Sequence, residues 1–310
     1  MSSMAGQQAN EEDNVTLSLP TENGWGAAPY FYLYQDFWYP STHFQNVYNF
    51  QNYFQAKDSD VFVASFPKSG TTWLKALTFA IVNHQNFSIE NHPLLNSNSH
   101  DLVPSPEINC DVRNLSNMTE PRLFGTHVPF PSLPKSILES DCRIIYICRN
   151  PFDTFVSAWN FLSKHKSVSS PALTLEEAFE KYCKGIIGYG PWWSHMLGYW
   201  KESIAKPNKV MFLKYEDLKE DANFHVKSVA EFLGCSFTEE DESDGVIESI
   251  IKLCSFEKMK GLEVNKFGNQ KMFDNKDFFR KAEIGDWVNY FSPSMIEKLS
   301  KIIEEKLSGS

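Results

Sequence analysis

One lysine, one glycine and two threonines stand close together in residues 65–73, which read SFPKSGTTW. An apolar run precedes this string and a helical pattern follows it, so a strand feeds a tight turn that opens into a helix. The free N–H groups and the positive dipole end of a first helical turn favour an anion. Gly70 permits close backbone approach, Lys68 adds a full positive charge, and Thr71 and Thr72 add hydroxyl donors. The string therefore predicts a phosphate-binding loop.

The spacing of this loop differs from that of the nucleotide-triphosphatase loop. In the pattern GxxxxGK[ST] two glycines precede the lysine, whereas Lys68 precedes the only glycine of the string. A kinase interpretation is weakened accordingly. Taken without other segments, the short KSG string is also compatible with a plain strand-to-helix turn that carries a surface lysine.

Further basic residues lie at two later places in the chain. Arg149 directly follows an apolar run, and Ser157 stands eight residues after it. Arg280 and Lys281 are adjacent near the C-terminus. Arginine can donate two parallel hydrogen bonds to a phosphate, and several such cations can neutralise it. Arg149 is also compatible with a structural ion pair, but ligands of open α/β sheets bind at strand ends, which favours a binding role.

Short apolar runs separated by helical patterns indicate the elements that carry these side chains. The runs at 60–66, 143–148 and 210–215 predict buried strands, and residues 71–84 predict a helix. Strands that read as continuous apolar runs form a mostly parallel sheet, which helices cover on both faces. The expected fold class is therefore α/β.

Capping residues indicate where two further helices begin. Thr174 with Glu177 forms a capping box, and Ser292 precedes a proline at the first helical position. The chain contains no internal repeat and no low-complexity linker. We therefore expect one domain over residues 16–310 and a disordered polar tail over residues 1–15.

The composition limits the classes of function. The formal net charge of −10 disfavours a nucleic-acid surface, which needs concentrated lysine and arginine. Hydrophobic residues make up 42% of the chain and include 25 phenylalanines, which is enough for a core and an apolar pocket. The six cysteines lack metal-binding spacing, and no apolar stretch reaches the roughly 18 residues of a membrane span. We expect a cytoplasmic protein without a metal site, a disulfide framework, a nucleic-acid partner or a membrane partner.

The three basic segments together resemble motifs of the cytosolic sulfotransferase family, in the same order. Residues 67–73, which read PKSGTTW, resemble its 5′-phosphosulfate loop, residues 149–157 its 3′-phosphate segment, and residues 279–287 its C-terminal RKGxxGDW element. The likeness runs from about residue 30 to the end, and it looks most like the plant branch, which acts on flavonols, hydroxyjasmonates and brassinosteroids. It implies transfer of a sulfuryl group from 3′-phosphoadenosine 5′-phosphosulfate (PAPS) to a hydroxyl.

The resemblance also assigns residues to the donor nucleotide. Trp73 stacks on the adenine, with help from the segment that contains Ser255 and Phe256, because stacking needs only a π-face. The full set implied for the donor is Lys68, Ser69, Gly70, Thr71, Thr72, Trp73, Arg149, Ser157, Trp193, Ser255, Phe256, Arg280, Lys281 and Ala282.

Sulfuryl transfer to an alcohol needs a base for the acceptor proton and positive charge near the leaving phosphate oxygen. The resemblance places the base at His127, within residues 124–130, and an imidazole can take a proton near neutral pH. It makes Lys68 the stabiliser of the leaving group and implies that Ser157 holds Lys68 aside until the acceptor arrives. We expect in-line transfer without a covalent enzyme intermediate and without a metal.

Aromatic residues are the candidates for the acceptor pocket. Seven of the ten residues 30–39 are aromatic, and Tyr34 and Phe37 are the candidates among them. Phe130, just after the histidine, and Phe161 complete the set. Such walls suit a planar phenolic, flavonoid, oxylipin or steroid-like compound.

The chain departs from the family pattern at several positions. Gly125 stands where many animal members carry a lysine, so that contact is lost or is supplied by the loop threonines. Ala282 replaces a glycine, which matters if the position has a positive φ. Trp193 replaces a tyrosine that often contacts adenine. Of the family's dimer motif, which falls on residues 288–297, only Glu297 matches, so we expect a monomer.

Three rival interpretations remain. A phosphoryl-transfer enzyme shares the physics of the strand, loop and helix, but it needs a magnesium-binding carboxylate at a strand end, and the sequence contains no convincing one. A catalytically silent nucleotide-binding protein is argued against by the presence of both Lys68 and His127. A Golgi sulfotransferase would carry a membrane anchor.

Overall fold

The computed structural model describes residues 18–109, 115, 118–165, 173–270 and 273–309. The tail expected to be disordered, residues 1–15, lies outside the described residues. The cysteine at position 110 also lies outside the described residues, and the other five cysteines are free thiols.

A four-stranded parallel sheet forms the centre of the molecule. Its order is β5-β4-β6-β7, and every neighbouring pair is parallel. The strands are β4 (Val61–Ser65), β5 (Leu123–Thr126), β6 (Arg143–Cys148) and β7 (Val210–Lys214). All of β4 is buried, because both faces of the sheet are covered, and this explains the continuous apolar runs. The predicted α/β fold is confirmed, whereas the short strand β5, which contains a glycine, was not predicted.

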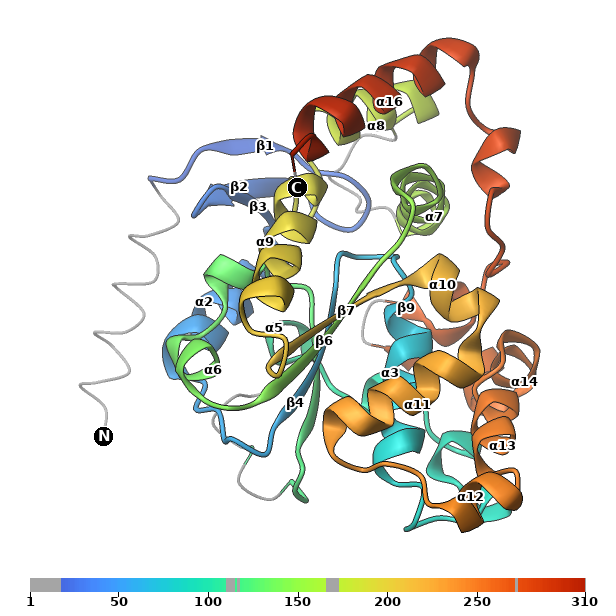
Figure 1. The fold of residues 1–310 in the computed structure, drawn as a ribbon. Coiled ribbons are helices and arrows are strands. Elements are labelled where there is room, and N and C mark those ends of the chain that lie inside the picture. Colours follow the sequence, from blue (N-terminus) through green and yellow to red (C-terminus); the bar gives the residue numbers. More distant parts are fainter. Residues whose placement is uncertain (1–17, 110–114, 116–117, 166–172, 271–272, 310) are drawn as a thin grey trace.

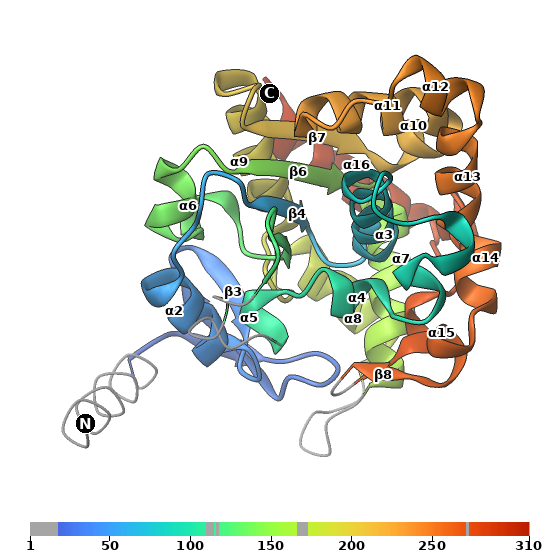
Figure 2. The same ribbon diagram turned by 90° about the horizontal axis from the view of Figure 1, so that it is seen from below.

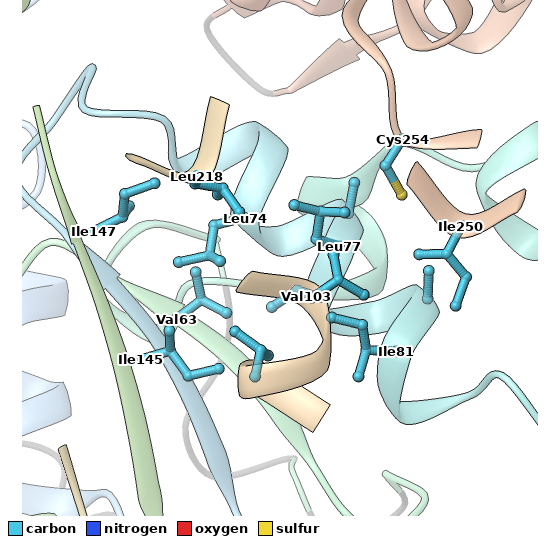
Figure 3. Close-up of a cluster of buried hydrophobic side chains, with 14 of the residues drawn as sticks. Val63, Leu74, Leu77, Ile81, Val103, Ile145, Ile147, Leu218, Ile250 and Cys254 are labelled. Carbon is cyan, nitrogen blue, oxygen red and sulfur yellow. The ribbon is translucent and has the colours of Figure 1, made fainter. Parts of the chain in front are cut away.

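One face of the sheet packs against the helix that follows the loop. This helix, α3 (Thr71–Val82), contacts α11 (Ala222–Leu233) and α13 (Val246–Leu253). Figure 3 shows Leu74 and Leu77 of α3 between Val63 and Ile145 of the sheet on one side and Ile250 on the other. Helix α3 is therefore packed between the sheet on one side and α11 and α13 on the other. This packing holds the loop at the N-terminus of α3 rigidly against the sheet.

An aromatic layer covers the opposite face (Figure 1). It contains α2 (Phe44–Tyr53), α6 (Lys135–Glu139), α9 (Trp192–Ala205) and a small antiparallel sheet. The strands of this sheet are β1 (Thr21–Asn23), β2 (Tyr30–Tyr34) and β3 (Phe37–Pro40). Residues 30–39 thus form a hairpin, of which Phe37 and Tyr39 belong to the core.

A third cluster of buried side chains joins the helix after β6 to the C-terminus. It contains α7 (Pro151–Lys164), α8 (Leu175–Cys183) and α16 (Pro293–Leu307), and Figure 1 shows α16 beside α8. The predicted capping box of Thr174 and Glu177 begins α8, and Ser292 caps α16 with Pro293 at its first position. Both predicted helix starts are confirmed.

Short elements fill the region between these layers. The segment of α4 (Ser99–Leu102) and α5 (Pro106–Asn109) runs from α3 to α2, since α4 contacts α3 and α5 contacts both α2 and β5 (Figure 2). None of the helices that the structure describes is long and apolar enough to cross a membrane. The remaining elements are α10 (Tyr215–Glu220), α12 (Glu239–Ser243), α14 (Phe256–Gly261), α15 (Glu263–Phe267), β8 (Asn269–Gln270), β9 (Phe273–Asp274) and the 3-10 turns Ile89–Asn91, Pro93–Leu95, Phe130–Ser132, Asn275–Phe278 and Asp286–Asn289.

Candidate active site

A cavity of about 630 Å³ opens at the carboxyl ends of β4, β5 and β6. Its volume lies within the range of small-molecule sites. Most of the residues assigned to the donor line it, although they come from five separated segments of the chain: Lys68, Gly70, Thr71, Thr72, Trp73, Arg149, Ser157, Ser255, Phe256, Arg280, Lys281 and Ala282. His127 and Phe161 line the same cavity.

The loop between β4 and α3 has the backbone conformation that a tight turn requires. Lys68 has a φ of 70° and Gly70 a φ of 111°. A Cβ on Gly70 would lie 2.8 Å from Cδ2 of Tyr215, so a larger residue does not fit. No side chain caps the N-terminus of α3, which leaves its first amide groups available to an anion. Ser69, within the loop, is buried and does not line the cavity.

The ammonium group of Lys68 lies over an aromatic ring. Its Nζ is 3.6 Å from the centroid of Phe161. Burial lowers the pKa of Lys68 to about 7, Asp277 raises it, and the nearby Arg149 lowers it further. Ser157 lines the cavity, yet Lys68 contacts Phe161 and not the serine hydroxyl, so the predicted contact between them is not formed here.

Arg149 is the most deeply placed of the cavity arginines. Its Nη2 donates to the carbonyl of Glu283 at 2.5 Å, and its guanidinium lies 4.6 Å from the ring centroid of Tyr215. Its Nε is buried and has no hydrogen-bond partner among the described residues. An unpaired buried donor is costly, so this atom fits a site whose ligand is an anion.

The C-terminal segment brings two further cations to the cavity. Arg280 and Lys281 donate to the two oxygens of Asp286 at 2.6 Å and 2.7 Å. Burial raises the pKa of Asp286, but these hydrogen bonds outweigh it and lower the pKa to about 2. Asp153 of α7 accepts the N–H groups of Gly285 (2.7 Å) and Trp287 (3.1 Å), which ties the segment to the helix that follows Arg149.

Ala282 adopts the conformation that its glycine counterpart would adopt easily. Its φ is 56°, in the left-handed region. Its carbonyl accepts hydrogen bonds from Tyr215 Oη at 3.1 Å and from Lys219 Nζ. The backbone shape of the motif is therefore kept at the cost of some strain.

The residues assigned to adenine are only partly brought together. Trp73 and Phe256 line the cavity, and the ring of Trp73 meets Tyr215 edge-on at 5.5 Å. The hydroxyl of Ser255 caps α14 by accepting the Lys258 N–H at 3.3 Å. Trp193 lies outside the cavity lining; it is the second residue of α9 and packs edge-on against Trp192.

The hydrogen bonds of His127 define its tautomer. Nδ1 lies 2.8 Å from the Ser65 carbonyl, which can only accept, so Nδ1 carries the proton and Nε2 keeps its lone pair. The backbone N–H of His127 donates to Oε1 of the buried Glu107 at 2.7 Å, and His195 Nε2 donates to its carbonyl at 2.9 Å. Burial lowers the pKa of His127 to about 3, although the Ser65 contact raises it. The ring is neutral near pH 7.

Gly125 is explained by a residue that sequence reasoning missed. A Cβ at this position would lie 2.1 Å from Cε and 2.4 Å from Nζ of Lys75. The side chain of Lys75, which projects from α3, is 1% exposed and occupies this space. In the sequence Lys75 has only the appearance of a helix lysine, so no local signal marks it. Of the two loop threonines, Thr71 has its Oγ1 paired with Ser65 Oγ at 2.6 Å.

The apolar wall of the cavity differs from the predicted one. Phe161 lines it, whereas Tyr34, Phe37 and Phe130 do not. Phe130 packs against Tyr199, and Phe37 belongs to the core of the second face. Successive residues of a strand face opposite sides, so Phe31 of β2 reaches the cavity and Tyr34 does not. The apolar wall is formed by Trp25, Ala28, Phe31, Pro40, Ile187 and Tyr189.

Comparison with known proteins identifies the family. The sulfotransferase domain model matches residues 58–310. The chain is 51% identical to cytosolic sulfotransferase 15 of Arabidopsis thaliana, over 94% of this chain and 84% of that protein. It is 46% identical to flavonol 4′-sulfotransferase of Flaveria chlorifolia, over 90% of this chain and 88% of that protein.

Solved structures agree with this result. A crystal structure of an Arabidopsis thaliana sulphotransferase has a TM-score of 0.75 and 38% identity, covering 96% of this chain and 92% of that one. A mouse sulfotransferase in complex with PAP, the desulfated donor, has a TM-score of 0.74 and 26% identity, covering 90% of this chain and 95% of that one.

The chain therefore belongs to the sulfotransferase family. It is a PAPS-dependent transferase, and its relatives include plant cytosolic members.

Proposed function

We propose that this protein transfers the sulfuryl group of PAPS to a hydroxyl of a small apolar acceptor, with His127 as the general base. One observation carries the proposal: the hydrogen bond from Nδ1 to the Ser65 carbonyl leaves Nε2 of His127 as a proton acceptor in the cavity wall. The cationic loop and the apolar wall share that cavity.

The described residues fit the donor. Lys68 and the first amides of α3 suit its phosphosulfate, and the unpaired Nε of Arg149 together with Arg280 suits its 3′-phosphate. When bound, PAPS supplies the sulfuryl group and a phosphate leaving group. Lys68 then stabilises the negative charge that develops on the leaving oxygen.

The proton of the acceptor hydroxyl goes to Nε2 of His127 while the acceptor oxygen bonds to sulfur and the sulfur–oxygen bond to the phosphate breaks. The ring is neutral because burial holds its pKa at about 3, so it has a free lone pair at physiological pH. The Glu107 carboxyl group accepts the backbone N–H of His127 and holds the main chain, and the Ser65 carbonyl accepts Nδ1–H and orients the ring.

The acceptor that suits the apolar wall is a phenolic, flavonoid, oxylipin or steroid-like alcohol. Aromatic side chains such as Phe31 and Trp25 provide flat apolar surfaces. Tyr189 adds a buried hydroxyl that has no hydrogen-bond partner among the described residues, and its ring lies 5.6 Å from that of His127. A polar group of the acceptor would satisfy it. The Flaveria relative is named for a flavonol.

We further propose that residues 16–310 act as one domain and that the protein works as a monomer in the cytosol. The sheet carries apolar clusters on both faces, and α3, α9 and α16 bind these layers to one another. The name of the Arabidopsis relative supports the cytosol. The family's dimer motif is matched only at Glu297, and the loss of its other residues supports a monomer.

Ligand-dependent stability tests the donor. A ligand present at about 100 times its dissociation constant adds about 2.7 kcal/mol to the free energy of unfolding. We expect PAP, and not ATP with magnesium, to raise the melting temperature, after which transfer of labelled sulfate can be screened over the acceptor classes. Stabilisation by ATP with magnesium alone would instead support phosphoryl transfer, and turnover that needs a metal would contradict the proposed chemistry.

A further inference from the structure

Lys75, which is buried, and His100, which is partly buried and lines the cavity, form a chain of hydrogen bonds beside the loop, and the reaction as described does not use it. Nζ of Lys75 donates to Ser105 Oγ at 2.9 Å and lies 3.2 Å from Nδ1 of His100. Nε2 of His100 lies 3.0 Å from Oγ1 of Thr72. The chain therefore ends on a hydroxyl of the phosphosulfate loop, in the first turn of α3.

The surroundings hold His100 firmly in place. Its backbone N–H donates to Oδ1 of Asn98 at 2.8 Å, and the neighbouring Ser99 hydroxyl donates to the carbonyl of Thr72 at 3.1 Å. Its ring packs on Phe278 with the centroids 4.6 Å apart. The helix α4 is thus docked onto the same residue that the imidazole contacts.

The donors and acceptors of this chain can be assigned in only one way while Lys75 is charged. An ammonium group has no lone pair, so Nδ1 of His100 must accept from Lys75. The proton of the neutral imidazole is then on Nε2, and it is donated to Oγ1 of Thr72. Among the described residues Thr72 Oγ1 has no second partner, and Thr72 lines the cavity. Its own proton is free to be donated there.

Lysine side chains are rarely buried, because removing the ammonium group from water costs free energy. Lys75 is 1% exposed, and its hydrogen-bond partners within the described residues, His100 and Ser105, are not carboxylates. Burial lowers its pKa to about 8, although Glu107 raises it, so the ammonium form dominates at pH 7. Burial and the charge of Lys75 hold the pKa of His100 well below its usual value, which keeps the imidazole neutral.

We propose that Lys75 and His100 are positioning residues that direct the Thr72 hydroxyl proton toward the 5′-phosphosulfate end of the donor. This inference rests on the proposed function, because it assumes that PAPS occupies the cavity with that end at the loop. The proposal also explains why residue 125 is a glycine, since any larger residue would displace the ammonium group of Lys75.

Two nucleotides that differ only in the 5′-phosphate test the proposal by calorimetry. PAP carries this phosphate and adenosine 3′-monophosphate lacks it, so their affinity ratio reports the contacts at the loop. We expect Thr72→Val to lower the affinity for PAP about 10-fold, the effect of one hydrogen bond to a charged group. His100→Leu and Lys75→Met are expected to cause most of the same loss. Binding of adenosine 3′-monophosphate should not change in any variant.

The double variant separates positioning from a second, independent contact. If His100 acts through Thr72, Thr72→Val combined with His100→Leu binds PAP no more weakly than Thr72→Val alone. The matched controls are His92→Leu and Lys209→Met, which remove a buried histidine and a partly buried lysine that do not line the cavity. They are expected to reduce stability and leave the affinity ratio unchanged.

Each outcome decides between the possibilities. An unchanged PAP affinity in His100→Leu, or losses that add in the double variant, overturns the inference and leaves the proposed function standing. A wild-type protein that does not bind PAP overturns the proposed function, and the inference with it. If His100→Leu does not fold, His100→Gln, whose amide N–H reaches Thr72, should bind PAP more tightly than the shorter His100→Asn, and equal affinities overturn the inference.

Discussion

The two ends of the cavity are built in different ways. The end proposed to bind the nucleotide is lined by residues 67, 68 and 70–73, Arg149, residues 255–256 and residues 279–282, which lie in loops and first turns at the ends of strands and helices. The end proposed to bind the acceptor is lined by single side chains from three places: Phe31 and Pro40 of the β2–β3 hairpin, Trp25 and Ala28 of the turn before it, and Ile187 and Tyr189 between α8 and α9.

This difference separates recognition by backbone and charge from recognition by shape. At the proposed nucleotide end, helix amides and cations are placed to meet an anion, and their placement follows from contiguous strings of residues. At the acceptor end the contacts depend on which face of β2 each ring occupies. Variants that act on one end and spare the other are therefore the most informative.

The largest effect is expected from His127→Ala. Loss of a general base lowers turnover about 10²- to 10⁴-fold. PAP affinity should stay the same, because His127 contacts none of the cavity cations. Initial rates with labelled PAPS and calorimetry with PAP measure the two effects. His92→Ala, which removes a buried histidine outside the cavity, should retain its rate, and wild-type turnover in His127→Ala would refute the assignment.

Arg149→Ala should weaken binding at the proposed nucleotide end of the cavity and spare the acceptor end. Loss of a charge-assisted hydrogen bond weakens PAP binding by about 1.5–3 kcal/mol. The affinity is measured by calorimetry. Arg143→Ala is the matched control, because Arg143 donates to the carbonyl of Leu233 at 2.8 Å and does not line the cavity. An equal affinity in the wild type and in Arg149→Ala would remove this residue from the nucleotide end.

The pH dependence of PAP binding tests the charge of Lys68. Burial lowers its pKa to about 7, and a bound anion favours the protonated form. Below pH 7 Lys68 is already protonated in the free protein. Above pH 7 Lys68 must take up a proton when PAP binds, so the affinity for PAP falls as the pH rises. The slope is at most about 10-fold per pH unit. Calorimetry from pH 6 to 9 measures it, and the slope should be smaller in Lys68→Met.

The smallest effect is expected from Ala282→Gly. Glycine adopts the left-handed conformation without strain, so the free energy of unfolding should rise by about 0.5–1 kcal/mol. Chemical denaturation measures the change. Ala230→Gly, inside the helix α11, is the opposite control and should lower stability by about 1 kcal/mol. Equal destabilisation by both substitutions would show that Ala282 is not strained.

The sequence predicted best those helices and strands whose local pattern of apolar and capping residues matches their burial in the folded protein. The strand at 143–148 was predicted with its observed bounds, and the helix predicted at 71–84 ends at Val82. Such elements follow from apolar runs and caps, which act over a few residues. The short strand β5 escaped prediction because Gly125 and Thr126 weaken its apolar pattern.

Side-chain placement at the acceptor end could not be predicted in the same way. The aromatic residues 30–39 indicated a candidate wall, but only the pairing of β2 with β3 decides that Phe31 faces the cavity. Lys75 shows the same limit. Its burial depends on the space above Gly125 and on His100, which approach it only after α4 docks on α3.

The amino-acid sequence by itself determined the family and the order of the cationic segments, and it located the proposed phosphate-binding loop, because contiguous residues encode them. Only the tertiary structure decided the apolar wall, the tautomer of His127 and the partners of Lys75. These depend on contacts between residues far apart in the chain, where register and burial, and not residue type, set which atoms meet.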